Sequence, residues 1–90
     1  MSDLAQSVTV EDAIRELLGG VLSPSVQPGA LAATDDLYNA GLSSLATVDL
    51  MLAVEDRFGI EFTNAWLTRR TFASIAALSN AVRHLSEDAP

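Results

Sequence analysis

Residues Gly41 to Gly59 read GLSSLATVDLMLAVEDRFG, and this stretch decides the fold. Its apolar side chains recur at three- and four-residue steps, which predicts a helix. They are Leu45, Val48, Leu50, Met51, Leu52, Val54 and Phe58. Ser43 is a suitable N-cap, and Gly59 is suited to turn the chain after the last helical turn. We therefore expect a helix that follows Ser43 and ends at Phe58.

The predicted helix has two apolar faces, which separate when the residues are wound at about 100° each. The core face carries Thr47, Leu50, Met51, Val54 and Phe58. The outer face carries Leu45, Val48 and Leu52, interleaved with the acidic residues Asp49, Glu55 and Asp56. Because an ordinary surface helix needs only one apolar face, the acid-edged outer face predicts a docking surface for a partner. The alternative is a core wide enough to cover both faces.

Composition sets the class of protein. A chain of 90 residues that is 49% hydrophobic is sufficient for one small domain with a single core. The absence of cysteine excludes a disulfide and a thiolate metal site. Twelve acidic residues and five arginines give a net charge of −7, which argues against binding to nucleic acid. This charge suits a partner with a basic surface, or it only keeps the domain in solution.

The chain also lacks membrane signals. No apolar run approaches the ~20 residues that cross a bilayer, and the N-terminal residues lack the regions of a signal peptide. We expect a cytoplasmic monomer that does not bind membranes.

Helical signals flank the central stretch on both sides. Thr9 opens a first helix, with Asp12 in a capping-box position, and Gly19-Gly20 loosen its last turn before Pro24 ends it. Its apolar positions are Val10, Ile14, Leu17, Leu18 and Val21. Residues 23–42 show no period, and we expect a packed loop across one end of a bundle, anchored by Leu31, Leu37, Tyr38 and Leu42.

After Gly59 the chain offers a short extended segment, a single helical turn and a last helix. The turn contains Trp66 and Leu67, and Ser74 caps the last helix. The apolar face of the last helix carries Ile75, Leu78, Val82 and Leu85. The fold class predicted is all-α, a four-helix bundle with a long first loop and a short third helix. We expect a single domain over residues 1–90, with a core of about 9–85 and flexible ends at 1–8 and 86–90.

The residues needed for catalysis or metal binding are missing. His84 is the only histidine, and it lies in the last predicted helix. Residues 41–45 compare poorly with a nucleophile elbow, because Leu45 replaces the second glycine and no strand precedes it. Asp35-Asp36 lack calcium-loop spacing and more readily help to solubilise the loop or cap a local turn. We therefore predict no catalytic residue and no metal ligand.

Ser44 lies at the start of the outer face, on the first turn of the predicted helix. Ser43 is already available as the cap, so the hydroxyl of Ser44 is free for another use. A phosphoester on Ser44 would lie near backbone N–H groups and the positive end of the helix dipole, which favours an anion by about 0.3–1 kcal/mol.

Three segments of the chain occur in a characteristic order. They are Asp35-Asp36-Leu37-Tyr38, then Gly41-Leu42-Ser43-Ser44-Leu45, then Val48-Asp49-Leu50 through Glu55-Asp56-Arg57-Phe58-Gly59-Ile60. In this order the sequence closely resembles the acyl carrier and peptidyl carrier proteins, four-helix domains that carry 4′-phosphopantetheine on a serine. The similarity runs from about Thr9 to Leu85. By position, Ser44 matches the modified serine. Leu45, Val48, Asp49, Leu52, Glu55 and Asp56 match the face on which partner enzymes dock.

The resemblance implies a carrier and not an enzyme. A phosphopantetheinyl transferase would use coenzyme A and Mg²⁺ to move 4′-phosphopantetheine onto Ser44 Oγ. The thiol of the arm would then hold an acyl or aminoacyl group as a thioester. Further partners implied are an acyl- or aminoacyl-activating ligase and downstream transferases.

The sequence departs from the family pattern at three places. Ser43 replaces the aspartate usual before the modified serine, Ala46 replaces a frequently acidic residue, and Arg69-Arg70 add positive charge. These departures favour a dedicated carrier of a specialised acyl group or an amino acid over general fatty-acid synthesis. Two alternatives stay open: an unmodified helical adaptor that binds through the outer face, and a small hydrolase that uses Ser44 and His84.

Overall fold

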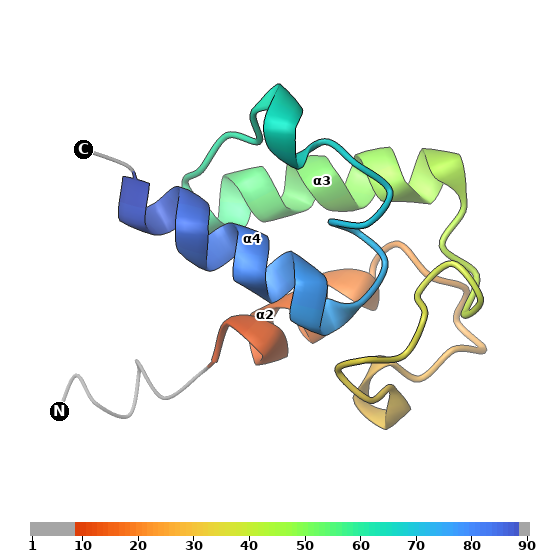
Figure 1. Ribbon diagram of the computed structural model, residues 1–90. Helices are drawn as coiled ribbons and strands as arrows, with labels where there is room; N and C mark the ends of the chain where they lie inside the picture. The colour runs from red at the N-terminus through yellow and green to blue at the C-terminus, as the bar shows by residue number, and fades with distance from the viewer. Residues whose placement is uncertain (1–8, 89–90) are drawn as a thin grey trace, which may run out of the picture.

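The computed structural model describes residues 9–88, which form an all-helical fold (Figure 1). Helix α2 (Val10–Leu18) begins as predicted, because the Asp12 backbone N–H donates to Thr9 Oγ1 at 3.0 Å. Ile14 and Leu18 on its inner face are fully buried. The prediction that this helix continues to Pro24 was wrong. Gly19 forms the C-cap, so the glycine pair ends the helix instead of only loosening its last turn.

The long connection between α2 and the next helix packs across one end of the fold (Figure 1). It contains one short 3-10 helix, η1 (Pro28–Ala30). Three hydrogen bonds attach the loop to the helices and their flanks. Arg15 Nη2 donates to the Leu31 carbonyl at 3.2 Å, and the Ala76 N–H donates to the Ala33 carbonyl at 2.8 Å. The Leu37 N–H donates to the carbonyl of Ala73 at 2.8 Å, and Leu37 and Leu42 are buried. The prediction of a packed loop is confirmed.

Helix α3 (Ser44–Phe58) has the bounds and caps that the sequence predicts. Ser43 Oγ accepts the Ala46 N–H at 3.1 Å, which satisfies one of the free donors of the first turn. At the other end Gly59 adopts φ 65° and ψ 37°, a left-handed conformation that glycine takes without steric cost. On the core face Leu50 and Val54 are fully buried.

The segment after α3 differs from the prediction. The expected short third helix is a single 3-10 turn, η2 (Asn64–Trp66), so residues 9–88 contain three α-helices where four were predicted. The turn ends at Leu67, which adopts φ −87° and ψ 66°, outside the helical region. Thr68 then begins a separate turn, in which its hydroxyl accepts the Thr71 N–H at 3.2 Å. Phe62 and Phe72 hold the two ends of this segment in the core, with ring centroids 5.3 Å apart.

Helix α4 (Ile75–Asp88) completes the fold. Ser74 caps it as predicted, because Ser74 Oγ accepts the Ala77 N–H at 3.0 Å. The helix extends beyond Leu85, where we expected the core to end. The predicted flexible end at 1–8, and residues 89–90 of the other end, lie outside the described residues.

The core lies between the three helices, with α2 packed against both α4 and α3. Its buried side chains include Ile14, Leu18, Leu37, Leu42, Leu50, Val54, Phe62, Phe72, Ile75, Leu78 and Val82. Within residues 9–88, none of the helices combines the length and the apolar character that crossing a bilayer requires. The start of α3 adjoins the long loop at one end of the fold, and this arrangement places the candidate site (Figure 1).

Candidate functional site at the start of α3

Ser44 is an exposed side chain at the first position of α3. Gly41 turns the chain just before it with φ 114°, and the buried Leu42 fixes the end of the loop to the core. Because Ser43 supplies the cap, the helix does not depend on the hydroxyl of Ser44. The fold therefore presents this hydroxyl to solvent at the positive end of a helix.

A hollow of about 500 Å³ opens beside Ser44. It is lined by Tyr38, Leu42, Ser43, Ser44, Thr47 and Arg69. Its lining is contributed by the long loop, the first turn of α3 and the segment after η2, so it exists only in the folded chain. Thr47 is fixed in it, since its hydroxyl donates to the Ser43 carbonyl at 2.7 Å.

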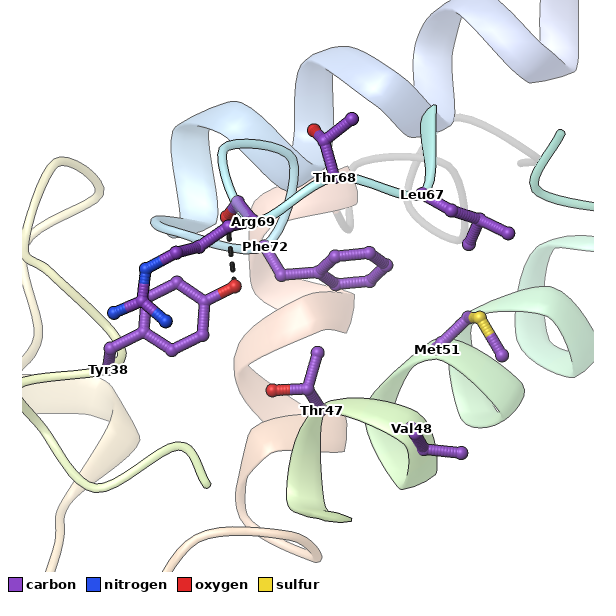
Figure 2. Close-up of a pocket in the computed structure, with 8 residues that line it drawn as sticks. All are labelled: Tyr38, Thr47, Val48, Met51, Leu67, Thr68, Arg69 and Phe72. Carbon is purple, nitrogen blue, oxygen red and sulfur yellow. Dashed lines mark hydrogen bonds between the residues drawn. The ribbon is translucent and has the colours of Figure 1, made fainter. Parts of the chain in front are cut away.

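A second, more apolar cavity of about 220 Å³ lies between α3 and the segment after η2 (Figure 2). It is lined by Tyr38, Thr47, Val48, Met51, Leu67, Thr68, Arg69 and Phe72. Tyr38, Thr47 and Arg69 line both hollows, so the two adjoin. A group attached at Ser44 would therefore have an apolar surface within its neighbourhood.

The outer face of α3 is open to solvent. Leu45 is 74% exposed, Val48 48% and Leu52 53%, so the alternative of a core that covers both faces is wrong. Asp49 and Asp56 are also exposed. Glu55 is different, because it is half-buried and its Oε2 accepts the Phe62 N–H at 2.9 Å. Partner binding by these residues stays a prediction.

Two residues of the candidate site, Leu67 and Tyr38, were not predicted from the sequence to belong to it. Leu67 is 45% exposed and lines the apolar cavity with Val48, so it continues the apolar surface beyond α3. Tyr38 was expected only as a loop anchor, yet it borders both hollows. The sequence carries a signal for the neighbouring Arg69, which lies in the one Arg-Arg pair of an acidic chain.

Two opposing charges surround the Tyr38 phenol. Partial burial raises the pKa of Tyr38 above its ordinary value of 10.0, and the nearby Asp36 carboxylate raises it further. The positive charge of Arg69 acts in the opposite direction and lowers this pKa. Tyr38 is therefore protonated and neutral at neutral pH.

The residues needed for hydrolysis or metal binding do not assemble here. His84 stacks on Trp66, with ring centroids 5.5 Å apart, and it does not line the hollow beside Ser44. The Asp35 and Asp36 carboxylates accept the backbone N–H groups of Ala32 and Tyr38, each at 2.9 Å, so they cap turns as expected. Within residues 9–88, no group of three or more His, Cys, Asp or Glu side chains could hold a metal ion.

The family follows from comparison with known proteins. Residues 12–82 match the family model described as a phosphopantetheine attachment site. The chain therefore belongs to the phosphopantetheine-binding carrier proteins, whose domain is the site of covalent 4′-phosphopantetheine attachment. This confirms the resemblance found in the sequence.

Three relatives support the assignment of family and fold. The aminoacyl carrier protein of Agrobacterium fabrum is 44% identical over 70 residues, which cover 78% of this chain and 84% of that protein. A structure of an engineered Bradyrhizobium japonicum glycine:[carrier protein] ligase with ATP and a carrier protein from Agrobacterium tumefaciens contains a chain that matches with a TM-score of 0.78. That match is 41% identical and covers 83% of this chain and 97% of the other. A holo acyl carrier protein from Nitrosomonas europaea matches with a TM-score of 0.72 and 30% identity, covering 83% and 92% of the two chains.

Proposed function

We propose that Ser44 carries the 4′-phosphopantetheine arm and that the thiol of the arm holds an aminoacyl group as a thioester. The proposal rests on one observation: two adjacent serines have different roles at the start of α3. Ser43 caps α3, while Ser44 is exposed at its first position. A phosphodiester on Ser44 would therefore leave the cap intact and lie near free N–H groups of the first turn.

The relatives support a proposal for the cargo and its loading enzyme. One relative is an aminoacyl carrier protein, and a structurally similar carrier was crystallised with a glycine:[carrier protein] ligase. We propose that this chain likewise receives an amino acid from an activating ligase, after a phosphopantetheinyl transferase has moved the arm from coenzyme A. The chain itself would be a non-catalytic, monomeric carrier in the cytoplasm.

The outer face of α3 is the proposed docking surface. Leu45, Val48 and Leu52 are exposed on the helix that Ser44 begins, and Asp49 and Asp56 border them. Apolar contacts with a charged rim suit a transient interface, in which the apolar centre gives affinity and the rim steers a basic partner. Glu55 would contribute through its charge and through the turn that it holds at Phe62.

The test is intact-mass analysis after incubation with coenzyme A, Mg²⁺ and a broad-specificity phosphopantetheinyl transferase. The wild-type chain is expected to gain one phosphopantetheine. Ser44→Ala is expected to gain none, whereas Ser43→Ala keeps the gain but loses about 1 kcal/mol of stability with its cap. A gain that persists in Ser44→Ala would refute the attachment residue.

The loading step has its own test. The holo protein is incubated with the glycine:[carrier protein] ligase, ATP and glycine, and the added mass is measured. A glycyl mass on the holo protein, absent from the apo protein, supports an aminoacyl cargo. The alternative function, an unmodified helical adaptor that uses the same outer face, predicts no mass gain with the transferase at all.

A further inference from the structure

Arg69 is held in place beside the hollow that contains Ser44. Its guanidinium carbon lies 3.8 Å from the centroid of the Tyr38 ring, a cation–π contact (Figure 2). The Tyr38 hydroxyl also donates to the Arg69 carbonyl at 2.9 Å. Tyr38 is fixed in turn, because its backbone N–H donates to Asp36 Oδ1 at 2.9 Å. One aromatic residue thus orients both the backbone and the side chain of this arginine.

On the side that faces Ser44, the charge of Arg69 borders a hollow whose lining contains no carboxylate. No acidic residue lines the hollow that Arg69 shares with Ser43, Ser44 and Thr47. The two ion pairs found among residues 9–87 use Arg15 and Arg57, and neither involves Arg69. The chain has a net charge of −7, yet the positive side chain of Arg69 lines the same hollow as the candidate attachment serine, Ser44.

We propose that Arg69 binds the phosphodiester of the arm on Ser44 and so fixes the direction in which the arm leaves the protein. This inference rests on the proposed attachment at Ser44. The phosphorus would be bonded to Ser44 Oγ, which places its anionic oxygens in the hollow that Arg69 lines. A guanidinium offers paired N–H donors that match phosphate oxygens, and its stacking on Tyr38 reduces the entropy lost on binding. Binding is non-covalent and changes no bond.

The adjacent Arg70 supplies a matched control. It lines a different hollow, with Thr34, Asp36 and Ser74, and it is absent from the one beside Ser44. Arg69 also borders this other hollow, so Asp36 is the carboxylate that could compete for its charge. Arg69→Gln and Arg70→Gln remove the same charge from neighbouring positions, and only the first is expected to affect the arm.

The experiment compares the apo protein with the holo protein made by the transferase, with conversion checked by intact mass. In ¹⁵N spectra of the arginine side chains, we expect the Arg69 Nε–Hε resonance to shift on conversion and that of Arg70 to stay unchanged. In ³¹P spectra of the holo proteins, Arg69→Gln should shift the phosphodiester resonance, while Arg70→Gln should match the wild type. Added NaCl should move the wild-type resonance toward that of Arg69→Gln, because salt screens the contact.

Arg69→Lys separates charge from geometry, since it keeps the cation and loses the planar pair of donors. We expect its ³¹P resonance between those of the wild type and Arg69→Gln. If Arg69→Gln does not fold, Arg69→Lys and the wild-type arginine spectra still test whether Arg69 contacts the phosphodiester. An Arg69 resonance that is the same in apo and holo protein overturns the inference. Equal ³¹P shifts in Arg69→Gln and Arg70→Gln do so as well.

Failure of the proposed function is seen separately. If the wild-type chain gains no mass, or if Ser44→Ala still gains it, then both the attachment at Ser44 and the role of Arg69 fall. If the mass gain requires Ser44 but Arg69 does not respond, then only the inference about Arg69 falls.

Discussion

Leu50 and Leu52 lie two residues apart on α3, yet Leu50 is fully buried and Leu52 is 53% exposed. Val54 and Val48 differ in the same way, at 0% and 48%. The buried pair belongs to the core cluster that includes Ile14 of α2 and Leu78 of α4, whereas no element within residues 9–88 covers the outer pair. The same kind of side chain is thus buried in the core on one face and exposed to solvent on the other.

The two faces also differ in their polar neighbours. The outer face is bordered by the exposed carboxylates of Asp49 and Asp56, while the core face contains only Thr47 as a polar residue. Contiguous apolar area next to charge is typical of surfaces that a partner covers. The difference between the faces can be tested by substitutions whose expected effects range from large to small.

The largest effect is expected for Leu50→Ala. Removing a fully buried leucine leaves a cavity and should lower the free energy of unfolding by about 2–5 kcal/mol. Leu52→Ala on the outer face should change it by no more than about 0.5 kcal/mol. Urea denaturation of the two variants measures the contrast. Equal losses would show that the outer face is part of the core.

The next effect concerns docking. Val48→Asp places a charge in the exposed apolar surface and should slow processing of the carrier about tenfold, equivalent to about 1.4 kcal/mol, with helix content unchanged. Leu52→Asp should act in the same direction. The measurements are the rate of aminoacyl loading on the holo protein and circular dichroism. Asn80→Asp adds the same charge to an exposed position of α4 and should leave the rate unchanged. Loss of helicity in Val48→Asp would contradict the assignment of this face.

A smaller effect is expected on the buried side of α4. Ser79 is fully buried, and its Oγ has no hydrogen-bond partner in the part of the chain that the structure describes, a state that costs free energy. Ser79→Ala should therefore raise the free energy of unfolding by about 1 kcal/mol. Ser86→Ala, at an exposed position of the same helix, is the control and should be neutral within about 0.5 kcal/mol. A destabilised Ser79→Ala would mean that the hydroxyl is satisfied in solution.

The smallest effect is expected at Tyr38, between the two hollows. It is the only tyrosine, so ultraviolet absorbance follows its ionisation directly. The midpoint should lie above the ordinary value of 10.0, and Arg69→Gln should raise it further, because Arg69 lowers the pKa. With a raised folded-state pKa, the unfolded chain loses the proton first, so this contribution to stability is complete below about pH 10 and declines above it. A midpoint below 10 would contradict the burial of the phenol.

Local signals explain why the sequence predicts so much of the helical structure. Ser43 and Gly59 delimit α3 because capping depends on residues a few positions apart, and Thr9 and Ser74 act in the same way at α2 and α4. The predicted third helix is only a 3-10 turn, because Leu67 leaves the helical conformation directly after Trp66. Thr68 forms its own turn with Thr71, and this turn is not visible in the hydrophobic period.

The hollow beside Ser44 could not be predicted from local sequence signals, because its lining residues come from distant segments of the chain. Tyr38 and Arg69 are 31 residues apart in the chain, and nothing in either neighbourhood indicates that they would stack. The Leu37 N–H donates to the Ala73 carbonyl close by, so this hydrogen bond also joins the long loop to the segment before α4. Leu67 likewise becomes part of the apolar surface only because it borders the same cavity as Val48.

By itself, the sequence determined where the three α-helices begin, the two-faced character of α3 and the serine at its start. These properties follow from the helical period and from capping, which act over a few residues. Only the tertiary structure decided that the outer apolar face stays exposed to water and which cation lies beside Ser44. Both outcomes depend on segments distant in the chain, since burial and electrostatic environment are properties of what packs around a residue.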